Sequence, residues 1–398
     1  MKLMVDCTPL HSGGGVQVAI AFLLNLQQRN EIDWTTLVPE RMRAMLPGCL
    51  QEDERLHFIR KDGRSDVFRI RSALKRLENG FSPDAVFTVF GPPYFNAQAP
   101  HIVGFGRSDI LYKPLVRVDL RTRAIHAITN RLRFRQLKKS DHLVVETETI
   151  RRRLARVLNV SDEKIAVIGN SLNPVLARHS PEKPPARGPF ALLIPSTYYP
   201  HKNLEIVPEV AKSLTSLSPS LDFEFQFTLK ADDAPWQSIA KQADKLGVGH
   251  RLKTLGPLTL DQLAGAYKAG SAVFLPTVRE ASTAVYPESF HFERPLVTSD
   301  LDFARELCGE AALFVPPFDA AAIARTIATL TNSPDLIQDL VAKGRRHLEN
   351  TYPDQNQKFE LQIELLRRVH ARNRLAQTSK GGAEIPMRAS ASGGAFRD

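Results

Sequence analysis

The sequence lacks the features of a membrane-spanning or disulfide-stabilised protein. Its 398 residues contain no apolar run of 18 or more, so we expect no transmembrane helix. The apolar part of the N-terminal stretch is too short for a signal peptide. Three cysteines, Cys7, Cys49 and Cys308, are scattered without a CxxC spacing, which fits a reducing compartment. We therefore expect a cytoplasmic protein.

Length and pattern indicate two α/β domains. The chain is too long for one typical core. Short β-branched runs alternate with amphipathic helical runs, which is typical of parallel sheets covered by helices. A proline-rich stretch without periodicity, 176–189, separates two such series. We expect a first domain over 1–175, a linker over 176–189 and a second domain over 190–350.

The C-terminal part is expected to differ from both domains. A helix of about 354–375 is expected to pack back on the first domain. The segment 377–398 is rich in Gly, Ser and Ala, and we expect it to be disordered. In doubly wound sheets ligands bind beyond the carboxyl ends of the strands, so two such domains would place the site in the cleft between them.

The positive charge is concentrated in one segment. The net charge is +10, which suggests an anionic partner. Residues 113–139 hold nine Lys or Arg and one Asp, with apolar residues at roughly helical spacing. This pattern predicts one or two amphipathic helices with a cationic face. That face is either simply solvated or makes peripheral contact with an anionic membrane, namely the inner face of the plasma membrane. No zinc-finger or RNP signature is present, so we expect no nucleic-acid partner.

A glycine-rich loop follows the first expected strand. Gly13, Gly14 and Gly15 let the backbone approach a ligand closely, and the helix after them offers free N–H groups to an anion. A dinucleotide fingerprint would need glycine at position 18, where the chain has Val18. The loop is therefore expected to bind a phosphate or a polar sugar. A merely tight turn and a nicotinamide site stay as alternatives.

Two glutamates separated by seven residues stand in the second half, in REASTAVYPESF. Glu280 follows a strand that ends near Thr277, and Glu288 is expected near the start of a helix because Pro287 suits a first turn. The small residues between them offer backbone N–H groups to a diphosphate. Each carboxylate can accept hydrogen bonds from paired sugar hydroxyls. The spacing suits a nucleotide-sugar; the alternative is that Glu288 only favours the helix dipole and Glu280 is solvated.

Residues 274–319 resemble the donor site of the retaining GT-B glycosyltransferases of family 4. The similar features are the paired glutamates, the strand and turn PLVTSD, and the stretch GEAALFVPPFD. The strand, loop and helix in YYPHKNLEIVPEVAKSL resemble the family's phosphate-binding lysine region. The resemblance runs from about residue 1 to 370 and is weak over 30–140. It implies a GT-B fold, with two Rossmann-like doubly wound domains facing a central cleft, the first binding acceptor and the second donor.

The resemblance implies donor-side roles for several residues. Glu288 would bind the donor ribose and Glu280 the transferred sugar, while Lys202 would neutralise the diphosphate. The family's arginine before this lysine is absent, and Lys230 is a candidate for the second positive charge. The remaining donor-side candidates are Ser282, Thr283, Ala284, Gly13, Gly14 and Gly15.

On the acceptor side, Gly106 and Arg107 stand where the family has a histidine. Arg107 and His11 are therefore the candidates there. Asp300-Leu301-Asp302 fits a metal-binding D-x-D pattern but is expected to be a turn and helix start. We expect neither a metal nor another cofactor, because lysines and helix amides can stabilise the leaving group.

The implied function is transfer of a hexose from a nucleoside-diphosphate sugar, with retention, to a hydroxyl of a glycan or lipid-linked acceptor in cell-surface polysaccharide synthesis. Two alternatives stay open. One is a GT-B sugar-nucleotide epimerase or phosphorylase, and the other is a non-catalytic nucleotide-sugar-binding protein, which the absent arginine and histidine keep open.

Overall fold

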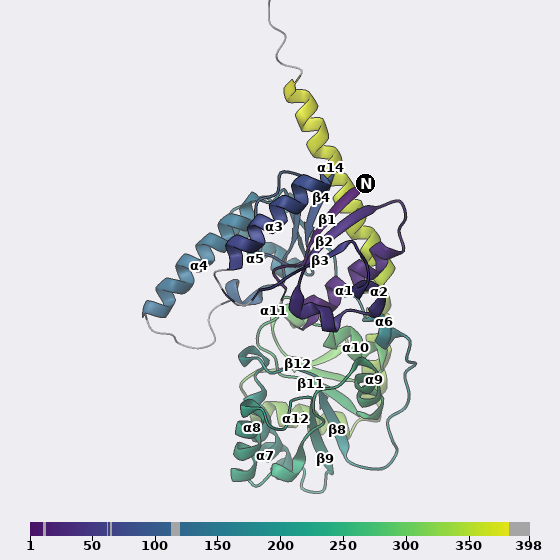
Figure 1. The fold of residues 1–398 in the computed structure, drawn as a ribbon. Helices are drawn as coiled ribbons and strands as arrows, with labels where there is room; N and C mark the ends of the chain where they lie inside the picture. Colours follow the sequence, from purple (N-terminus) through teal and green to yellow (C-terminus); the bar gives the residue numbers. More distant parts are fainter. Residues whose placement is uncertain (11–12, 62, 64–65, 113–119, 382–398) are drawn as a thin grey trace, which may run out of the picture.

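The chain folds into two α/β units, one above the other in Figure 1. The computed structural model describes residues 1–10, 13–61, 63, 66–112 and 120–381. Within these, seven parallel strands form the first sheet. In spatial order they are β3 (Leu56–Ile59), β2 (Asp33–Pro39), β1 (Lys2–Asp6), β4 (Ala85–Thr88), β5 (His101–Gly104), β6 (His142–Val145) and β7 (Ile165–Val167).

Six parallel strands form the second sheet in the described chain. In spatial order they are β10 (Leu252–Thr254), β9 (Phe223–Phe227), β8 (Phe190–Ile194), β11 (Ala272–Leu275), β12 (Leu296–Ser299) and β13 (Ala312–Val315). Strands β1, β4, β8 and β11 are almost wholly buried, as expected for parallel strands covered on both faces. The doubly wound architecture expected from the sequence is confirmed.

Along the chain the helices alternate with the strands, and in the fold they cover both sheets. In the first unit they are α1 (Gly14–Gln27), α2 (Gly48–Gln51), α3 (Asp66–Phe81), α4 (Leu120–Lys139) and α5 (Glu148–Leu158). The later ones are α6 (Pro174–Ala177), α7 (Val207–Leu217), α8 (Ala234–Lys245), α9 (Leu260–Ala269), α10 (Val285–His291), α11 (Asp302–Cys308), α12 (Ala320–Thr331), α13 (Pro334–Thr351) and α14 (Gln355–Gly381). The 3₁₀ turns are η1 (Glu40–Met45), η2 (Ser108–Ile110), η3 (Asp162–Lys164), η4 (Pro200–Lys202), η5 (Leu204–Ile206) and η6 (Gly249–Arg251). Along the described helices, none combines the length and apolar character that crossing a bilayer requires.

Each sheet has one place where the strand order reverses. In the first sheet it lies between β1 and β4, and in the second between β8 and β11. Ligands of doubly wound sheets bind beyond the carboxyl ends of the strands at such a point. The glycine loop follows β1, Lys202 follows β8 and Glu280 follows β11. These expected site residues therefore lie at the two reversal points, whereas Lys230 follows β9 and Arg107 follows β5.

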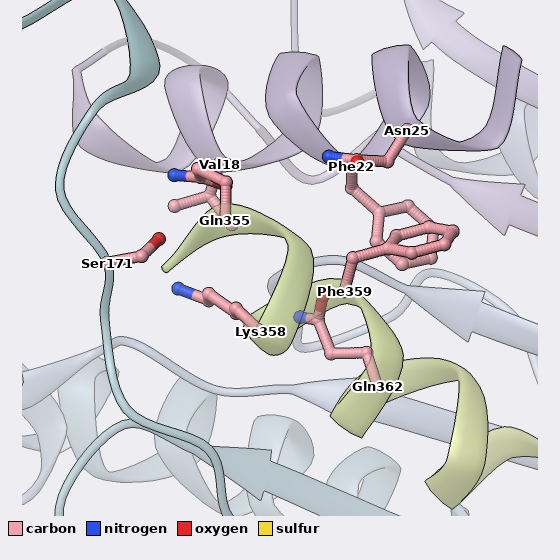
Figure 2. A pocket seen from close by; sticks show the side chains of 8 residues that line it. All are labelled: Val18, Phe22, Asn25, Ser171, Gln355, Lys358, Phe359 and Gln362. Carbon is pink, nitrogen blue, oxygen red and sulfur yellow. The ribbon is translucent and has the colours of Figure 1, made fainter. Parts of the chain in front are cut away.

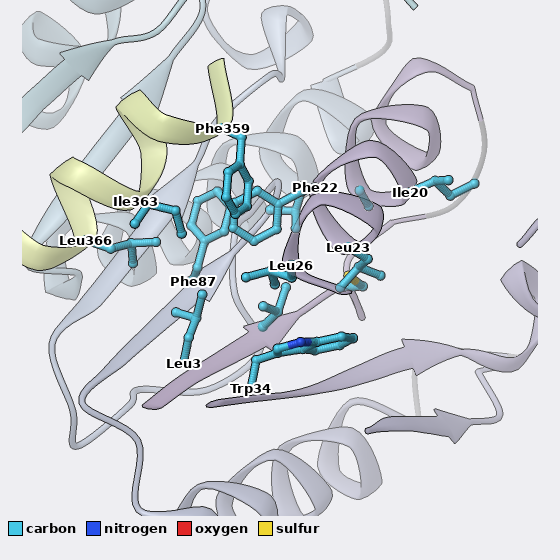
Figure 3. Close-up of a cluster of buried hydrophobic side chains, with 14 of the residues drawn as sticks. Leu3, Ile20, Phe22, Leu23, Leu26, Trp34, Phe87, Phe359, Ile363 and Leu366 are labelled. Carbon is cyan, nitrogen blue, oxygen red and sulfur yellow. The ribbon is translucent and has the colours of Figure 1, made fainter. Parts of the chain in front are cut away.

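Helix α14 returns to the first unit and completes its core. Figure 3 shows Phe359, Ile363 and Leu366 of α14 packed against α1 and the first sheet, and these side chains share one buried cluster with Phe22 and Phe87. The apolar face of α14 therefore ties the end of the chain to its beginning.

A buried ion pair fixes the start of the same helix. Lys358 Nζ donates to Glu146 Oε1 at 2.8 Å and to Asn170 Oδ1 at 3.1 Å. Figure 2 shows Lys358 opposite Ser171 beside a small cavity of about 10 Å³. The ammonium is thus held by the segments that follow β6 and β7.

Some elements differ from the expected ones. Strands β2 and β3 fall in the stretch 30–60, where no element was predicted. Helix α10 begins at Val285 instead of Pro287, and α14 continues to Gly381. The cationic segment forms one helix over Leu120–Lys139, while 113–119, His11 and 382–398 lie outside the described residues.

The two units contact each other through α11 and α5. Glu306 accepts hydrogen bonds from the backbone N–H groups of Glu148 and Thr149, the latter at 2.8 Å, so it satisfies free donors at the start of α5. Asp302 pairs with Arg153 and accepts from the Tyr112 hydroxyl at 3.1 Å. The turn and helix start expected at 300–302 is therefore found, with Asp302 as the first residue of α11.

Candidate active site

Lys202 and Glu280 meet at the carboxyl edge of the second sheet. Lys202 ends η4 after β8, and Glu280 stands in the loop after β11, its neighbour in the sheet. Lys202 Nζ lies 2.6 Å from Glu280 Oε1, and the Thr277 hydroxyl donates to the same oxygen at 2.8 Å. Only 12% and 9% of the two side chains are exposed. From the sequence, we expected both residues to contact the same nucleotide-sugar. Their pairing with each other was not predicted.

Two further basic side chains lie beside this pair. His201 Nε2 lies 3.9 Å from Glu280 Oε1, and the His201 ring stacks on Tyr199 at 5.4 Å. Burial lowers the pKa of His201 below its usual value; the charge of Glu280 opposes this, whereas Lys202 and Arg279 reinforce it. Sequence reasoning missed His201 and Arg279, although each directly precedes a predicted residue.

Glu288 is buried inside the second unit. It lies in the first turn of α10, and its Oε2 accepts a hydrogen bond from the Tyr267 hydroxyl at 2.8 Å. Burial raises the pKa of the carboxyl to about 7, and the bond from Tyr267 works in the opposite direction. The Glu288 carboxyl is buried and already accepts one hydrogen bond, and its oxygens can accept further hydrogen bonds from hydroxyl groups.

The loop between the two glutamates touches the first unit. Ala281 packs in the buried cluster that holds Phe105 and Val145, and its carbonyl accepts from the Thr147 hydroxyl at 3.3 Å. Ser282 Oγ is buried and has no hydrogen-bond partner in the described chain. Because buried hydroxyls are nearly always paired, this atom fits a place where a ligand binds. Thr283 Oγ1 accepts from the backbone N–H of Val285 at 3.4 Å, and Ala284 caps α10.

The glycine loop caps α1 without any side-chain hydrogen bond. Gly13 has φ 73°, a conformation that other L-residues rarely adopt. A Cβ on Gly14 would meet open space, whereas one on Gly15 would lie 3.3 Å from Leu10 Cδ2 and 3.4 Å from Phe90 Cδ2. The backbone N–H groups in the first turn of α1 therefore have no side-chain cap, and the side chains of Leu10 and Phe90 lie close to them.

Arg107, the candidate for the acceptor side, lies in the loop after β5 of the first unit and is paired with Asp109. Arg107 Nε donates to Asp109 Oδ1 at 3.0 Å. Burial would raise the pKa of Asp109, yet Arg107, Arg279 and Arg133 together hold it below the usual value. Asp109 in turn acts on His201. These electrostatic effects show that the loop after β5 lies within range of His201, which is itself beside the Lys202–Glu280 pair.

Lys230 is not joined to this cluster. It lies three residues beyond β9, its side chain is exposed, and no contact among the described residues links it to Lys202 or Glu280. Arg279, which directly precedes Glu280, instead acts through its charge on His201 beside the pair. The two acidic residues of the D-x-D pattern face different arginines, Asp300 pairing with Arg305 and Asp302 with Arg153.

Solved structures share the whole architecture. HepE from Anabaena in complex with UDP-glucose has a TM-score of 0.72, with 13% identity over 92% of this chain and 100% of that one. Sucrose-phosphate synthase from Thermosynechococcus elongatus has a TM-score of 0.70, with 15% identity over 93% and 99%. At these identities the likeness shows the fold, which is GT-B.

Sequence comparison adds relatives and family models. The O-antigen chain mannosyltransferase RfbU of Salmonella typhimurium is 24% identical over 50% of this chain and 54% of its own length. The D-inositol 3-phosphate glycosyltransferase of Streptomyces bingchenggensis is 24% identical over 53% and 49%. The chain thus spans about half the length of these relatives. The model for glycosyltransferase family 4 matches residues 13–175 and that for glycosyl transferases group 1 matches 190–333, so the chain belongs to the family 4, group 1 glycosyltransferases.

Proposed function

We propose that this chain moves a hexose from a nucleoside-diphosphate sugar, with retention of configuration, to a hydroxyl of a glycan or lipid-linked acceptor in cell-surface polysaccharide synthesis. The observation that carries the proposal is the Lys202–Glu280 pair, held by Thr277 at the reversal point of the second sheet. A carboxylate and an ammonium joined at 2.6 Å form a site that a sugar hydroxyl and a phosphate can share, each taking one partner.

In this proposal, the nucleotide-sugar donor would lie along the loop from Glu280 to Glu288. The ribose would donate its hydroxyls to Glu288, whose carboxyl is buried and already oriented by Tyr267. The diphosphate would lie over Ser282, Thr283 and Ala284, where backbone N–H groups start α10. Glu280 would then accept from the hexose, which stands at the far end of the diphosphate.

Stabilisation of the departing nucleoside diphosphate is assigned to protein cations. Lys202, which is paired with Glu280, and Arg279, which directly precedes it, would neutralise the diphosphate, and the first turn of α1 would add N–H groups from Gly14 and Gly15. We propose that these groups make a metal unnecessary. With no separate base assigned, the leaving phosphate would receive the proton of the attacking hydroxyl on the same face of the sugar, which gives retention.

The names of related proteins support the choice of donor and pathway. HepE has been solved with UDP and with UDP-glucose, and RfbU is named as a mannosyltransferase of the O-antigen chain. The first description fits a nucleotide-sugar donor, and the second fits transfer of a hexose to a surface polysaccharide.

We also propose a peripheral contact between the segment 113–139 and an anionic membrane. Helix α4 buries Leu137, but it exposes Ile125, Ile128 and Leu132, of which 48%, 64% and 60% are accessible. At about 100° per residue, these three lie on the face opposite Leu137. Lys139 and other exposed basic residues continue the same face, an arrangement suited to an anionic lipid surface. The exposed apolar residues therefore share a face of α4 with basic residues, opposite the buried Leu137.

The donor assignment is tested by nucleoside diphosphate release. Wild type, Glu280→Ala and the surface control Glu349→Ala are incubated with a panel of nucleotide-sugars, and binding is measured in parallel. We expect wild type and Glu349→Ala to bind one of the donors and to release its nucleoside diphosphate. Glu280→Ala should release nucleoside diphosphate at least tenfold more slowly than wild type. A protein that neither binds nor cleaves any donor would rule out the transferase.

A further inference from the structure

A second group of basic residues lies on the first unit, separate from the donor residues. Lys61 follows β3, Arg41 follows β2 within η1, and Tyr94 follows β4. Because parallel strands end at the same edge of a sheet, these residues gather at the carboxyl edge that also bears the glycine loop. The proposed transfer assigns none of them a role.

Hydrogen bonds fix the geometry of the group. Lys61 Nζ donates to the Tyr94 hydroxyl at 2.6 Å and to the Thr8 carbonyl at 3.0 Å, and it lies 4.5 Å from the centre of the Tyr94 ring. Arg41 Nη2 donates to the Leu10 carbonyl at 3.0 Å. The ammonium and the guanidinium are therefore both anchored on the short segment between β1 and the glycine loop.

Three guanidinium charges act on the Tyr94 hydroxyl, together with one carboxylate. Burial and the charge of Asp6 raise the pKa of Tyr94, whereas the charges of Arg41 in η1, Arg107 in the loop after β5 and Arg133 in α4 oppose the rise. Asp6 opposes them, but its oxygens accept hydrogen bonds from Thr8 at 2.6 Å and Thr88 at 3.0 Å below the surface.

The pKa of Lys61 shows that this clustering of cations is unfavourable. Burial and, to a smaller extent, the charge of Arg41 lower the pKa of Lys61 to about 8, while the charge of Asp6 opposes them. Bringing cations together in a half-buried place is unfavourable in the free protein. A bound anion removes that cost, which is why such clusters mark ligand sites.

We propose that Lys61, Arg41 and Tyr94 form a site for an anionic group, a phosphate, on the acceptor. The inference rests on the proposed transfer, because it gives the acceptor domain a substrate class. A phosphate has oxygens for the ammonium, the guanidinium fork and the phenol hydroxyl together. The same chemistry is carried by a soluble phosphorylated sugar or polyol and by the phosphate of a lipid-linked acceptor.

The first experiment uses sulfate, whose charge is constant between pH 7 and 9. Its affinity is measured by calorimetry for wild type, Lys61→Met, Tyr94→Phe and the exposed control Lys75→Met. We expect at least tenfold weaker binding for Lys61→Met, a several-fold loss for Tyr94→Phe, and wild-type affinity for Lys75→Met. Equal sulfate affinity in wild type and Lys61→Met would overturn the proposal.

The pH dependence identifies the ammonium as the binding group. Between pH 7 and 9 wild-type affinity for sulfate should fall, because Lys61 loses its proton near pH 8 and a neutral amine holds an anion poorly. Lys61→Arg should keep its affinity at pH 9, because a guanidinium stays protonated. An identical fall in Lys61→Arg would count against Lys61 as the source.

The two sources of phosphate are separated by competition. Displacement of sulfate by a soluble hexose phosphate assigns a soluble acceptor, whereas displacement by vesicles containing phosphatidic acid, but not by phosphatidylcholine vesicles, assigns a lipid phosphate. Displacement by neither would overturn the acceptor role. Nucleotide-sugar binding to wild type is measured alongside: sulfate binding without donor binding refutes the proposed transfer only, and donor binding without sulfate binding refutes this site only.

Discussion

Replacement of either partner of the Lys202–Glu280 pair should destabilise the second unit. Loss of one member of a buried ion pair costs about 3–5 kcal/mol, because the other charge is left with little water. Here 12% and 9% of the two side chains are exposed. After Lys202→Met, Glu280 still accepts from Thr277 at 2.8 Å and has His201 at 3.9 Å. We therefore expect a loss of about 2 kcal/mol, below that range.

The reciprocal change should cost more. Glu280→Gln keeps an oxygen that can accept from Thr277, but it leaves Lys202 beside Arg279 and His201 without the carboxylate that balances them. We expect a loss of about 3 kcal/mol. The double variant removes both charges, so it should be more stable than the sum of the single losses implies. The coupling between the two positions should be about 1–3 kcal/mol.

Urea unfolding can follow the second unit alone. Trp34 lies in the core of the first unit and Trp236 packs against Phe227 in the second, so a Trp34→Phe background makes Trp236 fluorescence report on the second unit. The exposed pair Arg305 and Asp300 is the matched control, and its cycle should show no measurable coupling. Additive losses at Lys202 and Glu280, within about 0.5 kcal/mol, would refute the reasoning.

Four other changes have defined outcomes. Because the folded pKa of Glu288, about 7, lies above the reference value of 4.5, wild type should lose up to about 3 kcal/mol of stability as the pH rises from 4.5 to 7, and Glu288→Gln should not; urea curves at several pH values decide this. Tyr267→Phe removes the donor to Glu288, so it should raise the pKa of that carboxyl further, as an NMR titration can show. Glu306→Ala should speed amide hydrogen exchange at the start of α5, while the exposed Glu310→Ala should not. Gly13→Ala should lower the melting temperature, because Gly13 has φ 73°, a conformation that residues with a Cβ rarely adopt.

The second unit could be predicted well because its pattern is local. The runs at β8 and β11 are continuous and apolar, and each is followed by the polar residues of the site. Glu280 was correctly expected in a loop, and Glu288 near a helix start. A buried strand and the turn after it are specified by neighbouring residues, so one sequence suffices to find them.

Contacts between distant segments could not be predicted in the same way. The pairing of Lys202 with Glu280 depends on β8 lying beside β11, and strand order is a property of the whole sheet. Lys230 was expected to supply a second positive charge, but the sequence could not show that β9, which it follows, lies one strand further from the reversal point than β8. Nor could it show that Arg279, in the loop after β11, acts on His201.

The net charge shows most clearly what the sequence alone left open. It indicated an anionic partner, but the structure divides the cations among the donor pair, the Lys61 group and α4, which suit three different ligands. Salt should distinguish them. The Debye length is about 8 Å at physiological ionic strength, so the exposed face around Ile128 should lose membrane affinity as salt rises. Lys202 and Lys61 are partly buried and fixed by short hydrogen bonds, so their ligands should be less sensitive. A single salt dependence shared by vesicle, donor and sulfate binding would mean that the three groups act as one diffuse field.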